Sequence, residues 1–226
     1  MRFGVLFSGG KDSTLALDLA SKKGEVVCLI TVISKNKESY MFHTPNIEFT
    51  KLQAQALAIP QITIISEGEK EEELDDLKKA IMLAKKKFEI EGLVTGAIES
   101  VYQSSRIEKI CNLLDIKCFN PLWKYNQKVL LETLVEMEYK VIISGIFAYP
   151  LDEQWLGKQI DKQVITKLVQ LQEKYGISPS GEGGEIETTV LDAPIFKQKI
   201  EVTEAKTEIR GNSGVYIIKQ AKLVTK

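Results

Sequence analysis

The sequence has little of what marks several common protein classes. Its 226 residues include one histidine and three cysteines, and no two cysteines form a CxxC pair or stand beside the histidine. This spacing argues against a structural zinc site and a disulfide framework. Lys and Arg number 30 and Asp and Glu 31, so neither sign is in excess. Without a global positive field, we expect no direct nucleic-acid partner.

Long apolar runs are also missing. No stretch is long enough to span a bilayer, and the first residues lack the basic start, apolar segment and cleavage site of a secretory signal. We therefore expect no membrane partner and a cytoplasmic location, which suits unpaired cysteines. Hydrophobic residues make up 44% of the chain, enough for a sizeable core.

The first half alternates short apolar runs with segments of helical period, which is typical of repeated βα units and a parallel sheet. We expect a doubly wound α/β fold with strand order 3-2-1-4-5. Acids at the start and lysines at the end of the third helix match the helix dipole, which favours a solvated helix. Strands are expected at 3–7, 26–33, 62–65, 93–95 and 116–119, and helices at about 13–23, 47–57, 71–90 and 104–114.

The pattern changes near Pro121. We place a domain boundary there, with a larger domain at 1–122 and a smaller α+β domain at 123–226. The tail alternates like antiparallel strands. The second domain is expected to contain helices at 127–137 and 160–175 and strands at 141–147, 197–208 and 214–223.

The first strand runs directly into a glycine turn and a helix start. The amides of such a turn, together with the positive helix end, favour phosphate. The spacing fits neither the usual triphosphatase loop nor the dinucleotide fingerprint, but matches the pyrophosphate loop of enzymes that cleave ATP between its α and β phosphates. An acid beside phosphate suggests that Asp12 helps to hold Mg²⁺. A plain helix cap is the alternative. The turn consists of Ser8, Gly9, Gly10, Lys11, Asp12 and Ser13.

Three more groups follow strands on the same rim of the predicted sheet, where ligands bind in open α/β folds. Backbone at the end of the fourth strand could face the ribose or α-phosphate. Arg106 could neutralise a phosphate or a carboxylate, or be a surface arginine. For His43, ligand contact and packing are equally open. The groups are Gly96 and Ala97; Tyr102, Gln103 and Arg106; and His43.

Residues 181–189 concentrate acids and glycines. Glu182, Glu185 and Glu187 lie among three glycines, between a helix and the tail strands. Flexible glycines with carboxylates suit the binding of a metal ion, an ammonium ion or a substrate amine. A solvated turn is the alternative.

Several motifs occur together in one order, from about residue 2 to residue 200, and they resemble the diphthine-ammonia ligase family. One departure is Ile186, where an aromatic residue is common. The resemblance implies an adenine nucleotide alpha hydrolase-like domain and a smaller C-terminal domain that carries the acidic motif. The motifs are SGGKDS at Ser8, YMFH at Tyr40, GAI at Gly96, YQSSR at Tyr102, PLW at Pro121 and GEGGEIET at Gly181.

The reaction implied by this resemblance amidates diphthine on translation elongation factor two. ATP and ammonium are consumed, and AMP and pyrophosphate are released through an acyl-adenylate. Lys11, the loop amides and Mg²⁺ would stabilise the departing pyrophosphate. The glutamates would attract and deprotonate ammonium or contact diphthine, and both roles stay open. The implied catalytic residues are Lys11, Asp12, Glu182, Glu185 and Glu187.

Two rival functions are kept. One is another pyrophosphate-loop enzyme, such as a tRNA thiolase, although the chain lacks the cysteine pairs and basic surface typical of thiolases. The other is a regulator that binds a nucleotide without chemistry. No motif reports the oligomeric state, so a homodimer is an open alternative.

Overall fold

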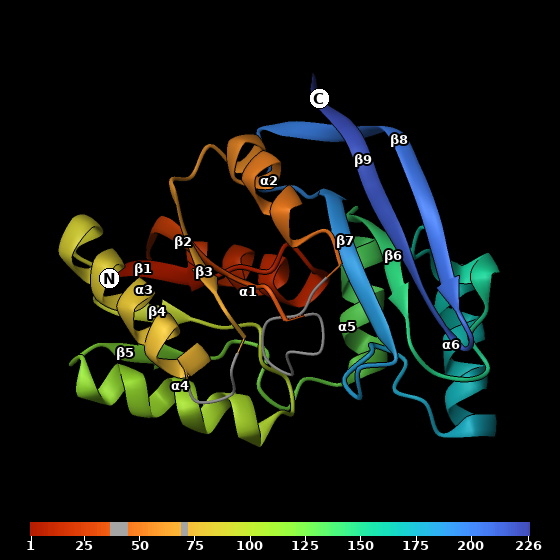
Figure 1. Ribbon diagram of the computed structural model, residues 1–226, viewed down its shortest axis with the longest axis horizontal. Helices are drawn as coiled ribbons and strands as arrows, with labels where there is room; N and C mark the ends of the chain where they lie inside the picture. Colours follow the sequence, from red (N-terminus) through yellow and green to blue (C-terminus); the bar gives the residue numbers. More distant parts are fainter. Residues whose placement is uncertain (37–44, 69–71) are drawn as a thin grey trace.

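A parallel sheet forms the first half of the molecule. The computed structural model describes residues 1–36, 45–68 and 72–226. The strand order is β3-β2-β1-β4-β5, which confirms the predicted topology (Figure 1). Its strands are β1 (Arg2–Leu6), β2 (Glu25–Ser34), β3 (Gln61–Ser66), β4 (Gly92–Val94) and β5 (Lys117–Phe119).

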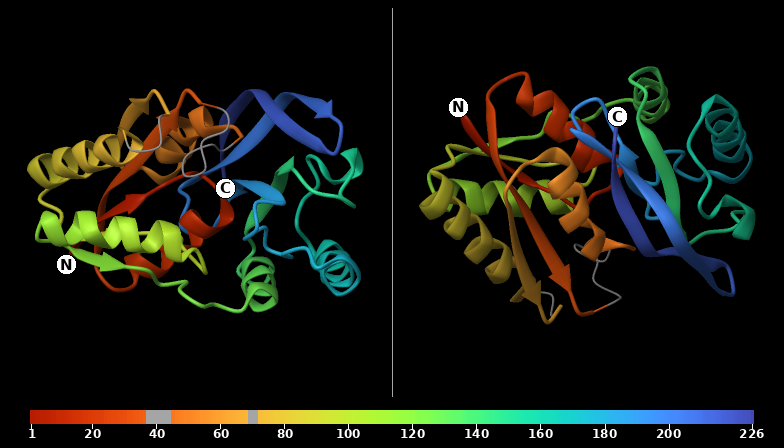
Figure 2. Two further views of the ribbon diagram at one scale, coloured as in Figure 1. Left: turned by 60° about the horizontal axis from the view of Figure 1, so that its bottom comes forward. Right: turned by 90° about the horizontal axis from the view of Figure 1, so that it is seen from above.

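Helices cover both faces of this sheet. Apolar residues of α1 and α2 contribute to one core cluster, and those of α3 and α4 to another. The left view of Figure 2 shows α3 and α4 on the same side of the parallel sheet. The helices are α1 (Lys11–Ser21), α2 (Thr50–Leu57), which follows the short 3-10 helix η1 (Ile47–Phe49), α3 (Glu72–Phe88) and α4 (Val101–Leu113).

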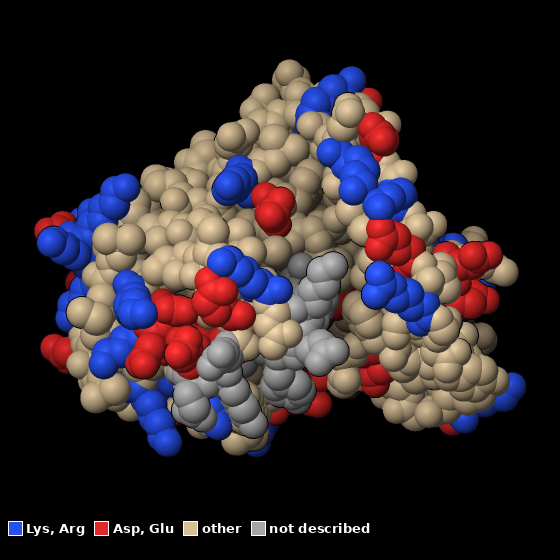
Figure 3. Space-filling model, viewed as in Figure 1, with Lys and Arg blue, Asp and Glu red and all other residues tan. Residues whose placement is uncertain are grey.

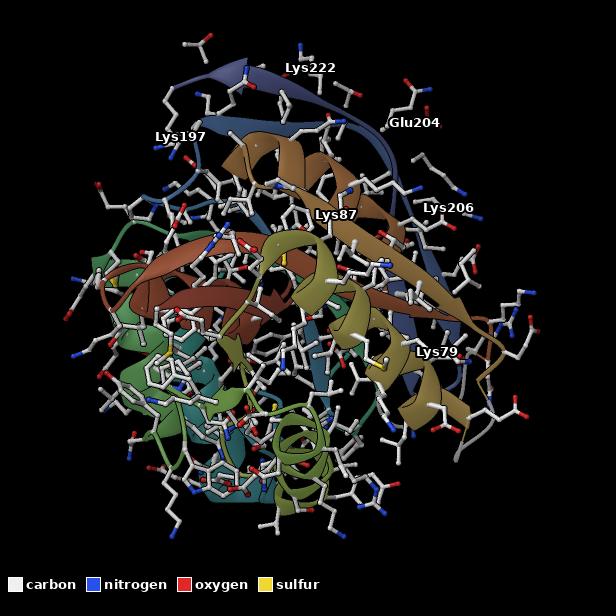
Figure 4. The ribbon with its side chains drawn as sticks, turned by 90° about the vertical axis from the view of Figure 1, so that its left-hand side faces the viewer. Lys79, Lys87, Lys197, Glu204, Lys206 and Lys222 are labelled. Atoms are coloured by element: carbon white, nitrogen blue, oxygen red, sulfur yellow. The ribbon has the colours of Figure 1, made fainter. Side chains whose placement is uncertain are left out.

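The acidic start of α3 differs from the prediction of a fully solvated charge run. Glu73 is only 3% exposed and accepts a hydrogen bond of 3.0 Å from the hydroxyl of Ser34, at the end of β2. The prediction was wrong at this residue because the helix start folds over the rim of the sheet. Lys79 and Lys87 of the same helix point away from the protein (Figure 4).

An antiparallel sheet of order β7-β6-β9-β8 forms much of the second half (Figure 1). The two predicted tail strands are confirmed as β8 and β9. No strand was predicted in the acid-rich segment, but its second half is a strand, because Ile186 to Val190 pair with β6. The elements are α5 (Gln127–Glu136), β6 (Lys140–Ile146), η2 (Glu153–Trp155), α6 (Lys162–Tyr175), β7 (Ile186–Asp192), β8 (Gln198–Arg210) and β9 (Ser213–Thr225).

The two sheets share one apolar core. Leu15 and Leu17 of α1 belong to the same buried cluster as Ile143 of β6 and Val190 of β7. The hydroxyl of Tyr139 donates to Asp18 of α1 over 2.9 Å, which adds a buried polar link. This packing holds the carboxyl rim of the parallel sheet against β7. A domain boundary at residue 122 stays a prediction.

The surface carries charges of both signs. Basic and acidic side chains lie among one another on the face in Figure 3, which also has broad areas without charged side chains. On the β8–β9 hairpin, the side chains of Lys197, Glu204, Lys206 and Lys222 point outward (Figure 4). Among the described residues, no helix combines the length and apolar character needed to cross a bilayer.

Candidate active site

A cavity of about 550 Å³ lies where the carboxyl ends of β1 and β4 face β7. Its walls include the loops after β1 and β4, the first half of α4, the residue after β6 and the acid motif. The structure therefore brings together segments that lie 177 residues apart in the sequence. The residues predicted for the site that line this cavity are Ser8, Gly10, Lys11, Asp12, Ser13, Gly96, Ala97, Gln103, Glu182 and Glu187.

The glycine turn is fastened directly to β7. The amide of Lys11 donates to the hydroxyl of Thr188 over 3.1 Å, and the amide of Val190 donates to the carbonyl of Gly9 over 3.0 Å. Gln53 of α2 donates to the same Gly9 carbonyl and to the carbonyl of Val190, at 2.9 and 2.8 Å. These hydrogen bonds form a joint between the glycine turn and β7, made by Gly9, Lys11, Gln53, Thr188 and Val190. Gly9 belongs to this joint and does not line the cavity. Its φ of +76° and the closeness of Gln53 both require glycine.

Lys11 and Asp12 lie at the start of α1. Gly10 is the N-cap and offers no side chain to cap the first turn. Lys11 is only 3% exposed, and its Nζ lies 2.7 Å from Oδ2 of Asp12. The other oxygen of that carboxylate, Oδ1, is buried and accepts no hydrogen bond from any described residue. A buried, unsatisfied carboxylate oxygen is costly, which points to an absent partner.

Two carboxyl groups of the acid motif titrate near neutral pH. Burial raises the pKa of Glu187 from 4.5 to about 7, with Lys11 opposing this rise and Asp12 and Glu182 adding to it. Burial likewise raises the pKa of Glu182 to about 7, with a further rise from Asp12, while Lys11 and a backbone hydrogen bond at Glu99 lower it. Acids with such pKa values can gain and lose protons at physiological pH.

The loop after β4 packs closely on the glycine turn, as predicted. A Cβ on Gly96 would lie 2.8 Å from the carbonyl carbon of Asp12 and from the nitrogen of Ser13, so only glycine allows this approach. Ser100 follows this loop and caps α4 by accepting a hydrogen bond of 3.3 Å from the amide of Gln103. Gln103 is thereby held at the cavity wall.

Other predicted residues lie elsewhere. The Glu185 carboxylate accepts a hydrogen bond of 3.0 Å from the amide of Ser178 and does not line the cavity formed by the described residues. Arg106 folds back over the ring of Tyr102, 3.5 Å from the ring centroid, and neither residue is part of the lining. His43 lies outside the described residues.

Comparison with known proteins identifies the family. Residues 1–118 match the diphthamide synthase N-terminal domain, and residues 126–224 match the diphthamide synthase C-terminal domain. The chain belongs to the diphthamide synthase family. A human protein named diphthine–ammonia ligase is 35% identical, over 92% of this chain and 85% of its own. The proteins of the same name from zebrafish (Danio rerio) and Schizosaccharomyces pombe are 32% and 31% identical, covering 94% and 92% of this chain and 90% and 37% of their own.

One solved structure is also similar. It is described as a predicted subunit of tRNA methyltransferase from Methanocaldococcus jannaschii, with a TM-score of 0.46 and 22% identity, and the match covers 86% of this chain and 98% of that one. This likeness is too low for that description to bear on this member of the diphthamide synthase family.

The cavity of this diphthamide synthase family member is built from both matched regions. Sequence reasoning missed Gln53, Phe147 and Thr188 as parts of the site. The sequence held a signal for Gln53, because it is a polar residue on the apolar face of a short helix. In the structure its side chain is 1% exposed. Thr188 lay inside the recognised acid motif, but its bond to the Lys11 amide depends on tertiary packing.

The donor set of the cavity fits a metal ion shared with a ligand. The described part of the chain contains no group of three acidic, histidine or cysteine side chains placed to hold a metal alone. Mg²⁺ commonly uses one or two carboxylates, together with water and substrate phosphates. The unpartnered Oδ1 of Asp12 fits that role in this diphthamide synthase family member.

Proposed function

We propose that this chain is an ATP-dependent ligase that amidates diphthine on translation elongation factor two. In this proposal it consumes ammonium and releases AMP and pyrophosphate. The supporting observation is the joint between the glycine turn and β7, where the amide of Lys11 donates to Thr188. The joint puts a phosphate-binding type of turn and two carboxyl groups into one cavity, as a ligase of this kind requires.

The ATP phosphates are proposed to bind at the first turn of α1. A volume of about 550 Å³ lies within the range of small-molecule sites. Lys11 is buried at the wall and supplies positive charge, and the positive end of α1 adds to it. Asp12 would hold Mg²⁺ jointly with phosphate oxygens, and the ion would offset their negative charge. Ser8, Ser13 and the backbone of Gly96 complete this part of the wall.

The carboxylate of diphthine must be activated before it can form an amide. A carboxylate oxygen would attack the α-phosphorus of ATP, the bond between the α-phosphorus and the bridging oxygen would break, and pyrophosphate would leave. Ammonium would first lose one proton to give ammonia, which would attack the acyl carbon of the acyl-adenylate, and AMP would leave. The nitrogen would lose a second proton as the amide forms, so this sequence takes two protons from ammonium.

Glu182 and Glu187 can accept these protons. Both line the cavity, and burial raises the pKa of each to about 7, which suits a general base near neutral pH. The Glu185 carboxylate instead holds the turn at Ser178. We therefore propose that one or both of the first two glutamates have the acid-base role and that Glu185 braces the turn.

The test uses purified protein, ATP, Mg²⁺, ¹⁵N-ammonium and diphthine-bearing elongation factor. We expect AMP and a factor that carries ¹⁵N in a carboxamide, with neither formed when Mg²⁺ is chelated. Loss of a general base commonly costs about 10²–10⁴-fold in rate, so Glu187→Gln or Glu182→Gln should lower the amidation rate in that range. Glu185→Gln is the matched control, since an amide oxygen can still accept from Ser178.

Other outcomes would favour the rivals. ATP binding without AMP formation would indicate a regulator, and AMP formed only when tRNA is present would indicate a nucleic-acid-modifying enzyme. A cytoplasmic location and a homodimer remain predictions.

A further inference from the structure

The chemistry of diphthine places a demand on this cavity, provided that the proposed function holds. Diphthine carries a trimethylammonium group on the same carbon atom as its reacting carboxylate. The carboxylate therefore cannot reach ATP without bringing a permanent cation into the cavity. This cation has no N–H group, so hydrogen bonds cannot hold it. Aromatic faces and negative charge are the groups that bind such cations in proteins.

Phe147 provides an aromatic ring in the cavity wall that also contains the acid motif. It follows β6 directly, is half-buried and lines the cavity. Its amide donates to the carbonyl of Glu185 over 2.9 Å, which ties the end of β6 to the acid motif. Among the described residues, the other aromatic residue in the lining is Phe7, which is 2% exposed and belongs to the core. Phe147 is thus the more exposed of the two rings in the lining.

Glu187 lies beside this ring. A Cβ on Gly145 would lie 2.7 Å from Cε2 of Phe147 and 3.1 Å from Cβ of Glu187, so the ring and the glutamate flank the same glycine. Gly145 also pairs with Glu187 across β6 and β7. The absence of a side chain at Gly145 allows the ring to pack beside the Cβ of Glu187.

Among the described residues, the carboxyl groups of Glu182 and Glu187 at this wall have no salt-bridge partner. Lys11, the cation nearest in the cavity wall, is bonded to Asp12. A cationic ligand would provide the missing countercharge.

We propose that Phe147 and Glu187 form a subsite for the trimethylammonium group of diphthine, with the ring face on one side of the cation and the carboxylate on the other. The subsite fixes the substrate carboxylate one carbon atom away from the bound cation. It also separates the roles of the two acids, because Glu182 is then the carboxyl left to take protons from ammonium.

The test compares two small probes. Glycine betaine joins a trimethylammonium group to a carboxylate through one carbon atom, whereas 3,3-dimethylbutyrate has the same shape with carbon in place of nitrogen. Each is titrated into the protein by NMR and is also assayed as an inhibitor of amidation. We expect the wild-type protein to prefer betaine. Phe147→Leu removes the cation–π contact, so the preference for betaine should fall by about 2- to 30-fold. The KM for the diphthine-bearing elongation factor should rise to a similar extent. The Kd for ATP should stay unchanged.

Two further variants separate the ring from the fold. Phe147→Tyr keeps an aromatic face and should retain the preference for betaine. Gly145→Ala keeps Phe147 but drives a Cβ into its ring, so it should lose the preference as Phe147→Leu does. Thermal unfolding of each variant verifies that it is folded under the assay conditions.

Failure of the subsite and failure of the ligase are distinguishable. If wild-type protein amidates the factor but Phe147→Leu leaves both the KM and the betaine preference unchanged, the subsite is wrong and the ligase stands. If wild-type protein yields no amidated factor, the ligase is wrong. The betaine titration then still decides the subsite, because a preference that depends on Phe147 supports it and equal binding of the two probes overturns it.

Discussion

The replacement of Glu187 by glutamine should make the protein more stable at alkaline pH while it removes activity. The carboxyl lies in a cavity where burial raises its pKa from 4.5 to about 7. An acid whose pKa is higher in the folded state than in the unfolded state binds more protons when folded. Its ionisation therefore lowers the free energy of unfolding as pH rises from about 4.5 through 7. Glutamine cannot ionise, so the variant lacks this loss.

The size of the effect follows from the pKa change. A rise from 4.5 to about 7 corresponds to about 3 kcal/mol, because each pKa unit is worth about 1.4 kcal/mol. Water at the cavity mouth screens part of this cost, so we expect about 1–3 kcal/mol. The advantage of Glu187→Gln over the wild-type protein should widen by that amount between pH 5 and pH 8.5. In a protein of this size, each kcal/mol shifts Tm by about 2–4 °C.

Urea denaturation at both pH values measures this difference directly. Glu173→Gln is the matched control, since it removes an exposed carboxylate from α6 and should change stability by less than about 0.5 kcal/mol at either pH. A Glu187→Gln protein that is no more stable than the wild-type protein at pH 8.5 would refute the argument, because the carboxylate would then be well solvated or paired.

Further predictions concern the packing around the glycine turn. Gln53→Leu removes two buried hydrogen bonds, to Gly9 and Val190, and should lower the free energy of unfolding by about 2–4 kcal/mol in urea denaturation. Gln55 is exposed on the same helix, so Gln55→Leu should change the free energy of unfolding little. Equal effects of the two substitutions would contradict the role assigned to Gln53. Gly96→Ala forces a Cβ to within 2.8 Å of the first turn of α1. Since overpacking costs about 1–3 kcal/mol, ATP affinity should fall about tenfold in calorimetric titration, and unchanged affinity would show that the turn is not an ATP site.

The parallel half of the fold was predictable because its determinants are local. Short β-branched runs alternate with helical segments, and right-handed crossovers then limit the strand order to few choices. The glycine turn after Phe7 was visible for the same reason, since two glycines between a strand and a helix define a backbone shape. The apolar stripe of α3 was readable too, whereas the burial of Glu73 was not, because it depends on where the helix start meets the rim of the sheet.

The acid motif shows where local information ends. Its glutamates were recognisable in the sequence, but nothing in the sequence distinguished the roles of the three carboxyl groups. In the structure, β7 pairs with β6 and is hydrogen-bonded to the glycine turn. As a result Glu182 and Glu187 line the cavity, whereas Glu185 accepts a hydrogen bond from Ser178. The sequence by itself determined which chemical groups are present and the order of the parallel strands. Only the tertiary structure decided which groups share a cavity and which titrate near pH 7, because burial and distance depend on contacts between residues far apart in the chain.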